Sequence, residues 1–196
     1  MTARGGWVFV FLVGIVSATM AGKPLAPSEL HGIARVSGKP TADVLVWVDA
    51  PGTEAVAKET PVVLDQRNLS FAPRVLAVRV GTTVEFPNND RVFHNVFSFR
   101  DGKRFDLGLY PVGSSRRVTF DRPGLSRIYC NIHPNMAAYV MAVDSVYFAV
   151  SDRSGIFRIA AVPTGTYRYY AWRPGAEPLT GTWSSATDGP LTIEWR

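Results

Sequence analysis

The stretch YCNIHPNM, residues 129–136, holds the only cysteine of this 196-residue chain. His133 follows Cys130 by three positions, and Met136 follows His133 by three more. A single cysteine cannot form an internal disulfide, and in a secreted protein a leftover thiol indicates an intermolecular bridge, a reactive group or a metal ligand. The imidazole and the thioether that follow it on the same short loop favour the metal ligand.

The donor types on this loop match one kind of metal site. A trigonal set of one thiolate and two imidazoles, with a long axial thioether, is typical of blue copper. The second imidazole is available from His94, which lies in a predicted strand, and the chain has only one other histidine, His31. We therefore predict one copper ion, cycling between Cu(I) and Cu(II), on His94, Cys130 and His133, with Met136 as the axial ligand.

Three further residues are placed to support these ligands. Pro134 removes a backbone donor and stiffens the chain directly after His133, and Asn131 begins the tight turn before it. Asn95 follows His94, and its side chain could hydrogen-bond the ligand loop and hold the two parts of the site together. We predict that these three residues surround the site without binding the ion.

The sequence also leaves room for different roles of the cysteine. A free cysteine is often a small buried core residue, and a nearby histidine could act as the base for a nucleophilic thiol. Zinc could take the thiolate and both imidazoles and keep one position open. No orienting acid or oxyanion motif stands out for a nucleophile, and a thioether is a poor zinc ligand. Met136 alone could instead be a residue that fills the core.

The rest of the sequence indicates an all-β protein. Apolar residues make up 46% of the chain, enough to bury a core. Short runs rich in β-branched and aromatic residues are separated by clusters of Pro, Asn, Asp and Gly, which is typical of sandwiches and barrels. No segment keeps a helical period. The predicted strands lie within residues 44–48, 75–86 (two strands around Gly81), 92–99, 116–120, 126–130, 137–143, 146–150, 155–162, 165–172 and 191–195.

The N-terminus predicts export. Arg4 precedes an apolar run over residues 7–16, and Ala18 and Ala21 offer small residues for cleavage. This order is that of a secretory signal peptide over residues 1–21. The run of about 10 apolar residues is roughly half of what spans a bilayer, and a retained membrane anchor is the alternative. We therefore expect a periplasmic or otherwise exported protein.

The stretch from residue 61 to 144 resembles a cupredoxin of the plastocyanin and amicyanin group. The resemblance rests on GTTVEFPNND at 81–90, on FHN at 93–95 and on the Cys-x-x-His-Pro-x-Met loop. It implies a Greek-key β-sandwich, the copper ligands named above, and a one-electron outer-sphere carrier that is not an enzyme. It also implies a redox protein as partner, for example a c-type cytochrome or a dehydrogenase, and electrons that leave through His133.

The flanks, residues 22–60 and 145–196, together resemble one small carboxypeptidase-regulatory-like or transthyretin-like sandwich. The turns that carry this resemblance are Gly38-Lys39-Pro40, Asp152 to Gly155 and Pro163 to Tyr167. The whole chain resembles bacterial proteins of the methylamine utilization protein type. We expect the cupredoxin sandwich to be inserted in, or joined to, this second sandwich. A single enlarged sandwich is the alternative.

Two other functions fit the same sequence. The protein could bind and deliver copper in the periplasm, although it has no methionine-rich tract. It could instead be an adhesion or carbohydrate-binding module with a structural metal, using Trp172, Trp183 and Trp195 as contacts. Nucleic acid is not expected as a partner, because the net charge of +5 is spread along the chain. No stable membrane span is expected after signal cleavage.

Overall fold

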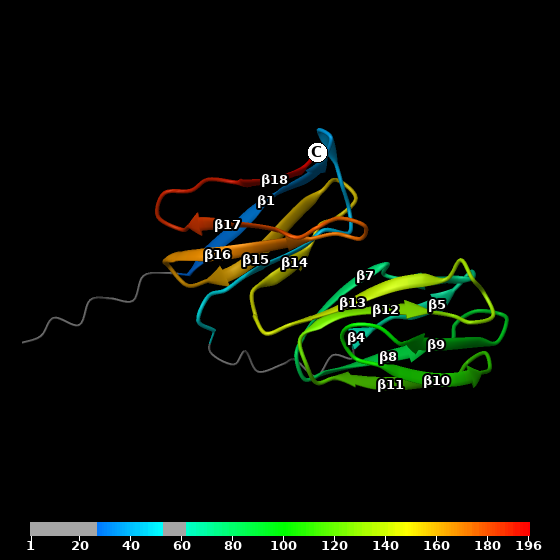
Figure 1. Cartoon of the computed structure of the whole chain (residues 1–196). Coiled ribbons are helices and arrows are strands. Elements are labelled where there is room, and N and C mark those ends of the chain that lie inside the picture. The colour runs from blue at the N-terminus through cyan, green and yellow to red at the C-terminus, as the bar shows by residue number, and fades with distance from the viewer. Residues whose placement is uncertain (1–26, 53–61) are drawn as a thin grey trace, which may run out of the picture.

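The computed structural model describes residues 27–52 and 62–196. The predicted signal peptide, residues 1–21, lies outside the described residues. Within them the regular elements are strands, as the all-β prediction requires (Figure 1). No helix in these ranges is long and apolar enough to cross a membrane. In chain order the strands are β1 (Ser28–Val36), β2 (Lys39–Pro40), β3 (Leu45–Val48), β4 (Val62–Val63), β5 (Asp65–Arg67), β6 (Ser70–Ala72), β7 (Val75–Arg79), β8 (Thr82–Pro87), β9 (His94–Ser98), β10 (Phe105–Tyr110), β11 (Ser115–Phe120), β12 (Gly124–Tyr129), β13 (Ala137–Val143), β14 (Phe148–Val150), β15 (Ile156–Val162), β16 (Thr166–Trp172), β17 (Leu179–Ser184) and β18 (Leu191–Trp195).

One sandwich is built from the middle of the chain, coloured teal to yellow in Figure 1. Its larger sheet has the order β10-β9-β12-β13-β7, and its smaller sheet has the order β11-β8-β4. Two neighbouring pairs are parallel, β13 with β7 and β4 with β8, and the other pairs are antiparallel. Parallel neighbours cannot be joined by a tight hairpin and need crossover connections. The arrangement agrees with the predicted Greek-key sandwich.

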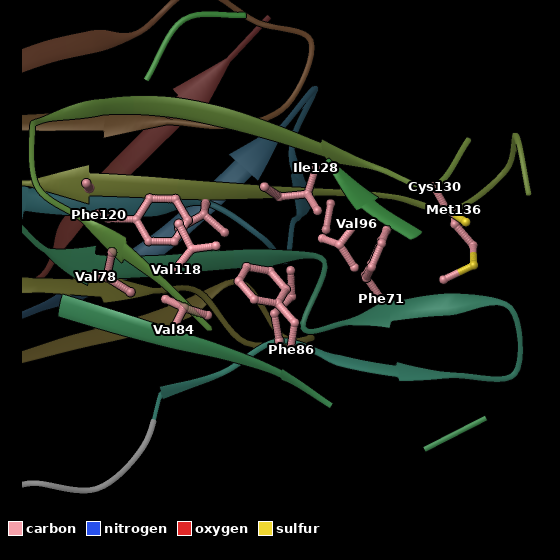
Figure 2. Close-up of a cluster of buried hydrophobic side chains, with 14 of the residues drawn as sticks. Phe71, Val78, Val84, Phe86, Val96, Val118, Phe120, Ile128, Cys130 and Met136 are labelled. Atoms are coloured by element: carbon pink, nitrogen blue, oxygen red, sulfur yellow. The ribbon is translucent and has the colours of Figure 1, made fainter. Parts of the chain in front are cut away.

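The strands of this sandwich alternate between the core and the surface, because successive side chains of a strand point to opposite faces. Val84 and Phe86 on β8 are buried, with the less buried Glu85 between them. On β12 Ile128 is buried and Arg127 is exposed. Burying one such apolar side chain contributes about 1.5–3 kcal/mol. The core that results includes Phe71, Val78, Val84, Phe86, Val96, Val118, Phe120 and Ile128, and it ends at Cys130 and Met136 (Figure 2).

A second sandwich is built from strands on both sides of the central segment. β1 pairs with β15 and, in parallel, with β18, and β2 pairs with β1. The facing sheet has the order β14-β3-β16-β17. Each sheet mixes early strands with strands from the last third of the chain, so neither flank forms this sandwich alone. Its core includes Leu30, Ala34, Val46, Phe157, Ile159, Trp183, Ile193 and Trp195.

The two sandwiches meet through a separate apolar cluster. Trp172, at the end of β16, lies edge-to-face against Tyr139 on β13, with ring centroids 5.6 Å apart. The other buried members of the cluster are Leu45, Val75 and Val143. Trp172, Trp183 and Trp195 are all buried. These tryptophans are therefore packing residues, and their burial gives no support to carbohydrate contact through them.

The structure also contains strands that the sequence pattern does not predict. β10 forms an edge of the larger sheet, with a bulge between Asp106 and Leu109. Gly108 sits inside this bulge with a φ of +64°. Glycine and aspartate are both depleted in strands, so they mask the pattern here. By contrast, the two strands predicted around Gly81 are present as β7 and β8.

Candidate metal centre

The loop over residues 130–136 connects β12 to β13 at one end of the central sandwich. The N–H of Cys130 donates to the carbonyl of Met136 at 3.4 Å, and the N–H of Met136 donates to the carbonyl of His133 at 2.9 Å. Cys130 and Met136 are buried at the end of the core, where Figure 2 shows them next to each other. His133 is half-buried, and the other loop residues are exposed. The loop therefore buries both sulfur-bearing side chains and leaves one imidazole near the surface.

His94 reaches the same place from β9, of which it is the first residue. Its side chain is fully buried, and its ring meets the ring of His133 with centroids 4.8 Å apart. The two Nδ1 atoms lie 3.1 Å apart, and Sγ of Cys130 lies 3.6 Å from Nδ1 of His133. One ligand atom from each of these three residues lies within 4.8 Å of the other two. The fold thus brings together three donors that are separated by up to 39 positions in the chain.

These separations suit a single ion. Two nitrogen ligands at about 2.0–2.1 Å from a metal, or one such nitrogen and one sulfur at about 2.3 Å, lie roughly 3.3–3.8 Å apart at tetrahedral to trigonal angles. The Sγ–Nδ1 distance of 3.6 Å lies in this range, and the Nδ1–Nδ1 distance of 3.1 Å is slightly shorter. A thiolate with imidazoles and a neighbouring thioether is a donor set that suits copper. The residues present therefore fit a copper ion.

The second ring nitrogen of His94, Nε2, faces a carboxylate. This nitrogen lies 3.0 Å from Oδ2 of Asp90, whose side chain is only 8% exposed. The backbone N–H groups of Leu69, at 2.7 Å, and of Arg91, at 2.8 Å, donate to the same carboxylate. The hydrogen bond from Leu69 is the main cause that lowers the pKa of Asp90 to about 2, against burial, which raises it. Because a carboxylate can only accept, His94 carries its proton on Nε2 and offers Nδ1 to a metal.

The turn that carries Asp90 is itself held from two sides. Nδ2 of the buried Asn88 donates to the carbonyl of Val92 at 2.9 Å, and its Oδ1 accepts from the N–H of Asp90 at 3.1 Å. The N–H of Asn89 donates to the carbonyl of Gln66, on the β5–β6 hairpin, at 3.0 Å. The backbone on which the carboxylate stands is therefore fixed by the fold.

The structure gives Asn95 a different partner from the expected one. Its Nδ2 donates to Oδ1 of Asp106 on β10 at 2.8 Å, so this bond ties β9 to β10 and not to the loop that carries Cys130. The reason is the strand period: neighbouring residues point to opposite faces, and His94 takes the face toward the loop. Asn131 and Pro134 lie on the loop with their side chains exposed.

Asp90 is the supporting residue that sequence reasoning misses. The signal was present, because Asp90 stands four positions before His94. The polar run Asn88-Asn89-Asp90 is equally typical of an ordinary turn, however, and nothing local distinguishes the two. The contact with Leu69, 21 positions away, depends on the tertiary fold.

A hydrogen-bonded pair lies buried beneath the site. Tyr110, on β10 opposite His94, is fully buried and donates its hydroxyl to the carbonyl of Phe86 at 3.0 Å. Nε2 of Gln66 donates to the same hydroxyl. Burial raises the pKa of Tyr110 to about 12, against the hydrogen bond from Gln66, which lowers it. The phenol therefore stays neutral across the physiological range and joins β10 to β8 and to the β5–β6 hairpin.

Exposed apolar side chains directly precede both histidines. Ile132, before His133, is 48% exposed, and Phe93, before His94, is 51% exposed. Pro134 is exposed on the other side of His133. The partly exposed imidazole is thus flanked by apolar surface.

Residues 58–143 match the family model of copper binding proteins of the plastocyanin/azurin family. The match covers less than half of the chain and coincides with the central sandwich. It ends at Val143, the last residue of β13, and includes all four predicted copper ligands. A search among curated proteins finds no match.

Several solved structures are similar to this chain. A purple cupredoxin from Nitrosopumilus maritimus is 26% identical, with 42% of this chain and 99% of that chain covered and a TM-score of 0.39. A variant of amicyanin in its oxidised form is 22% identical, with 50% of this chain and 98% of that chain covered and a TM-score of 0.39. A copper-containing nitrite reductase from Thermus scotoductus SA-01 is 29% identical, with 50% of this chain and 26% of that chain covered and a TM-score of 0.42.

The family match and the donor cluster point to the same cofactor. The match places the central segment among copper binding proteins, and the structure places a cysteine and two histidines within reach of one ion inside that segment. The central sandwich is therefore a cupredoxin domain, and its cofactor is copper.

Proposed function

We propose that this protein is a type 1 copper protein that carries single electrons between redox proteins in the periplasm. The observation that carries this proposal is the cluster of His94, Cys130 and His133, whose ligand atoms lie within 4.8 Å of one another. The family match over the same part of the chain supports it.

In this proposal His94 and His133 would hold copper through Nδ1, Cys130 through Sγ, and Met136 through its thioether. When bound, copper supplies a one-electron couple between Cu(I) and Cu(II). The chain holds the donors in one arrangement: Asp90 and β9 fix His94, and two backbone hydrogen bonds fix the loop. Preorganised donors need little rearrangement when the charge of the site changes, and this favours outer-sphere transfer.

Electrons would pass through His133, the one proposed imidazole ligand that is only half-buried. The exposed Ile132 and Pro134 beside it offer a small, weakly polar contact. Redox encounters of this kind typically use interfaces below about 1,200 Å². The partner would be another redox protein, such as a c-type cytochrome or a dehydrogenase, and not nucleic acid.

The proposal does not include catalysis, because four donors from the chain leave no coordination position for a substrate. Copper delivery is a second candidate, and the half-exposed position of His133 favours it, since a receiving protein could reach that ligand. Adhesion or carbohydrate binding is a weaker third candidate, because the tryptophans that would serve it are buried.

The cellular setting is also part of the proposal. Export rests on the N-terminal signal sequence, residues 1–21. We infer that residues 22–60 and 145–196 form a transthyretin-like module into which the cupredoxin domain, residues 61–144, is inserted, as in proteins of the methylamine utilization type. The shared sheets of β1 with β15 and β18, and of β3 with β14 and β16, support this division.

The first test is the visible absorption and EPR spectrum of the mature protein after addition of Cu(II). We expect an intense thiolate-to-copper absorption that is lost in Cys130→Ala. His31→Ala is the matched histidine control, because His31 is on the surface beside Glu29, and it should keep the colour. A colourless wild-type protein that binds only zinc or Cu(I) would contradict the proposal.

The second test separates the carrier from the delivery protein. A carrier is expected to retain copper in both oxidation states during repeated reduction and oxidation in the presence of a chelator. A delivery protein is expected to lose Cu(II) to the chelator and to exchange Cu(I) readily. Loss of copper within one redox cycle would favour delivery over electron transfer.

A further inference from the structure

We propose that Asp90 is a positioning residue that biases the copper centre toward Cu(II) by acting through His94. The inference rests on the proposed ligand set, in which His94 binds through Nδ1. It adds a residue that is not itself a ligand to the determinants of the redox balance.

The contact is short and shielded from water. Nε2 of His94 lies 3.0 Å from Oδ2 of Asp90. The imidazole is fully buried and the carboxylate side chain is 8% exposed. A charge in such a place is screened far less than one on the surface. The negative charge of Asp90 therefore acts on the ligand with less attenuation by solvent than a charge on the open surface would.

The carboxylate is held in place by separate parts of the chain. Leu69, at the tip of the β5–β6 hairpin, donates its N–H to Oδ2, and Arg91, in the turn itself, donates its N–H to Oδ1. Asn68 and Leu69 both have positive φ, at 53° and 54°, as a two-residue type I′ hairpin turn requires. The hairpin turn thus aims a backbone donor at Asp90. A carboxylate fixed in this way keeps the His94 ring in one orientation.

The direction of the effect follows from charge. A carboxylate that accepts the Nε2 proton raises the basicity of the imidazole and makes its Nδ1 a stronger donor. A stronger donor and a nearby anion both favour the more positive ion, Cu(II). Removing one unit of charge at this distance, in a partly shielded site, is expected to change the equilibrium between the two oxidation states by about tenfold or more.

Another carboxylate near the site provides a control. Asp106 accepts from Nδ2 of Asn95 and from the N–H of Gly108, and it is exposed. It contacts the residue after His94 and no proposed ligand. Asp106→Asn therefore makes the same change of charge close to the centre without touching the imidazole.

The test compares Asp90→Asn with wild type, Asp90→Glu and Asp106→Asn, all as full mature chains loaded with copper. The readouts are the thiolate-to-copper absorption, the EPR spectrum and the midpoint potential. We expect Asp90→Asn to keep the type 1 spectrum and to shift the equilibrium toward Cu(I) by tenfold or more, which is about 59 mV upward for one electron. Asp90→Glu keeps the charge and should stay closer to wild type, as should Asp106→Asn.

The outcomes are separable. A wild-type protein without the type 1 spectrum would overturn the proposed function and this inference together. A normal spectrum with an unshifted potential in Asp90→Asn, or an equal shift in Asp106→Asn, would overturn this inference alone. If Asp90→Asn does not fold, Asp90→Glu is compared with Asp106→Asn. A larger shift of the midpoint potential in Asp90→Glu, which keeps the charge, than in Asp106→Asn would refute the role of the charge.

Discussion

Met136 is the proposed ligand whose role is most open to a direct test. Its side chain is 1% exposed and belongs to the core that also holds Phe71 and Val96 (Figure 2). It can therefore be an axial ligand, a core residue or both. Met136→Leu separates these roles, because leucine fills a similar volume but offers no donor.

The core role sets the expected effect on the copper-free protein. A volume-conserving exchange of methionine for leucine usually costs less than about 1.5 kcal/mol. Met136→Ala would instead leave a cavity at a fully buried position and cost about 2–5 kcal/mol. Urea denaturation of both copper-free variants and of the wild type measures these losses. The comparison uses the same dependence of the unfolding free energy on urea concentration for all three.

The ligand role sets the expected effect on the copper-bound protein. Removing the thioether takes electron donation away from Cu(II) more than from Cu(I), so the midpoint potential should rise. We expect Met136→Leu to shift the equilibrium between the two states by about tenfold, or about 59 mV. The visible and EPR spectra should change in parallel.

Met141→Leu is the matched control, because Met141 is a half-buried methionine on β13 in the cluster between the two sandwiches. It should leave spectrum and potential unchanged. If Met136→Leu gives the same spectrum and potential as Met141→Leu, Met136 only fills the core, and the ligand assignment fails.

Three further predictions concern stability. Because burial raises the pKa of Tyr110 above its unfolded value, the neutral phenol stabilises the fold below about pH 10, and this contribution is lost as the pH rises toward 12. An ultraviolet titration should show one tyrosine ionising only near pH 12, and that step should disappear in Tyr110→Phe; its survival would refute the assignment. Trp172→Ala should cost about 3–5 kcal/mol, and a double-mutant cycle with Tyr139→Ala should give a coupling of about 0.5–1.5 kcal/mol; additive denaturation energies would mean that the ring contact contributes nothing. Gly155→Ala should destabilise the fold well beyond the roughly 1–2 kcal/mol of a left-handed alanine, because its Cβ would lie 2.5 Å from the carbonyl oxygen of Ala34. Gly175→Ala, with φ +77° and open space, is the control, and equal losses in thermal unfolding would contradict the clash.

The chemistry of the proposed metal site could be predicted from the sequence because it depends on donor type and local spacing. Cys130, His133 and Met136 lie within seven residues, and few metals suit a thiolate, imidazoles and a thioether together. Short runs rich in β-branched and aromatic residues between turn clusters likewise predicted most strands of the central sandwich, including the pair around Gly81, because strand and turn preferences are local properties.

The surroundings of the site depended on contacts between distant parts of the chain. Asp90 meets His94 because its turn is clamped by a hairpin around Leu69, and Asn95 turns to Asp106 because β10 pairs with β9. The edge strand β10 itself lacked a clear pattern, since a bulge with a left-handed glycine breaks the alternation. Local spacing thus predicted three of the four proposed donors, which lie on one loop, while His94 comes from a separate strand. The tertiary fold decided which groups support those donors, because the β5–β6 hairpin holds Asp90 beside His94 and the pairing of β10 with β9 brings Asp106 to Asn95.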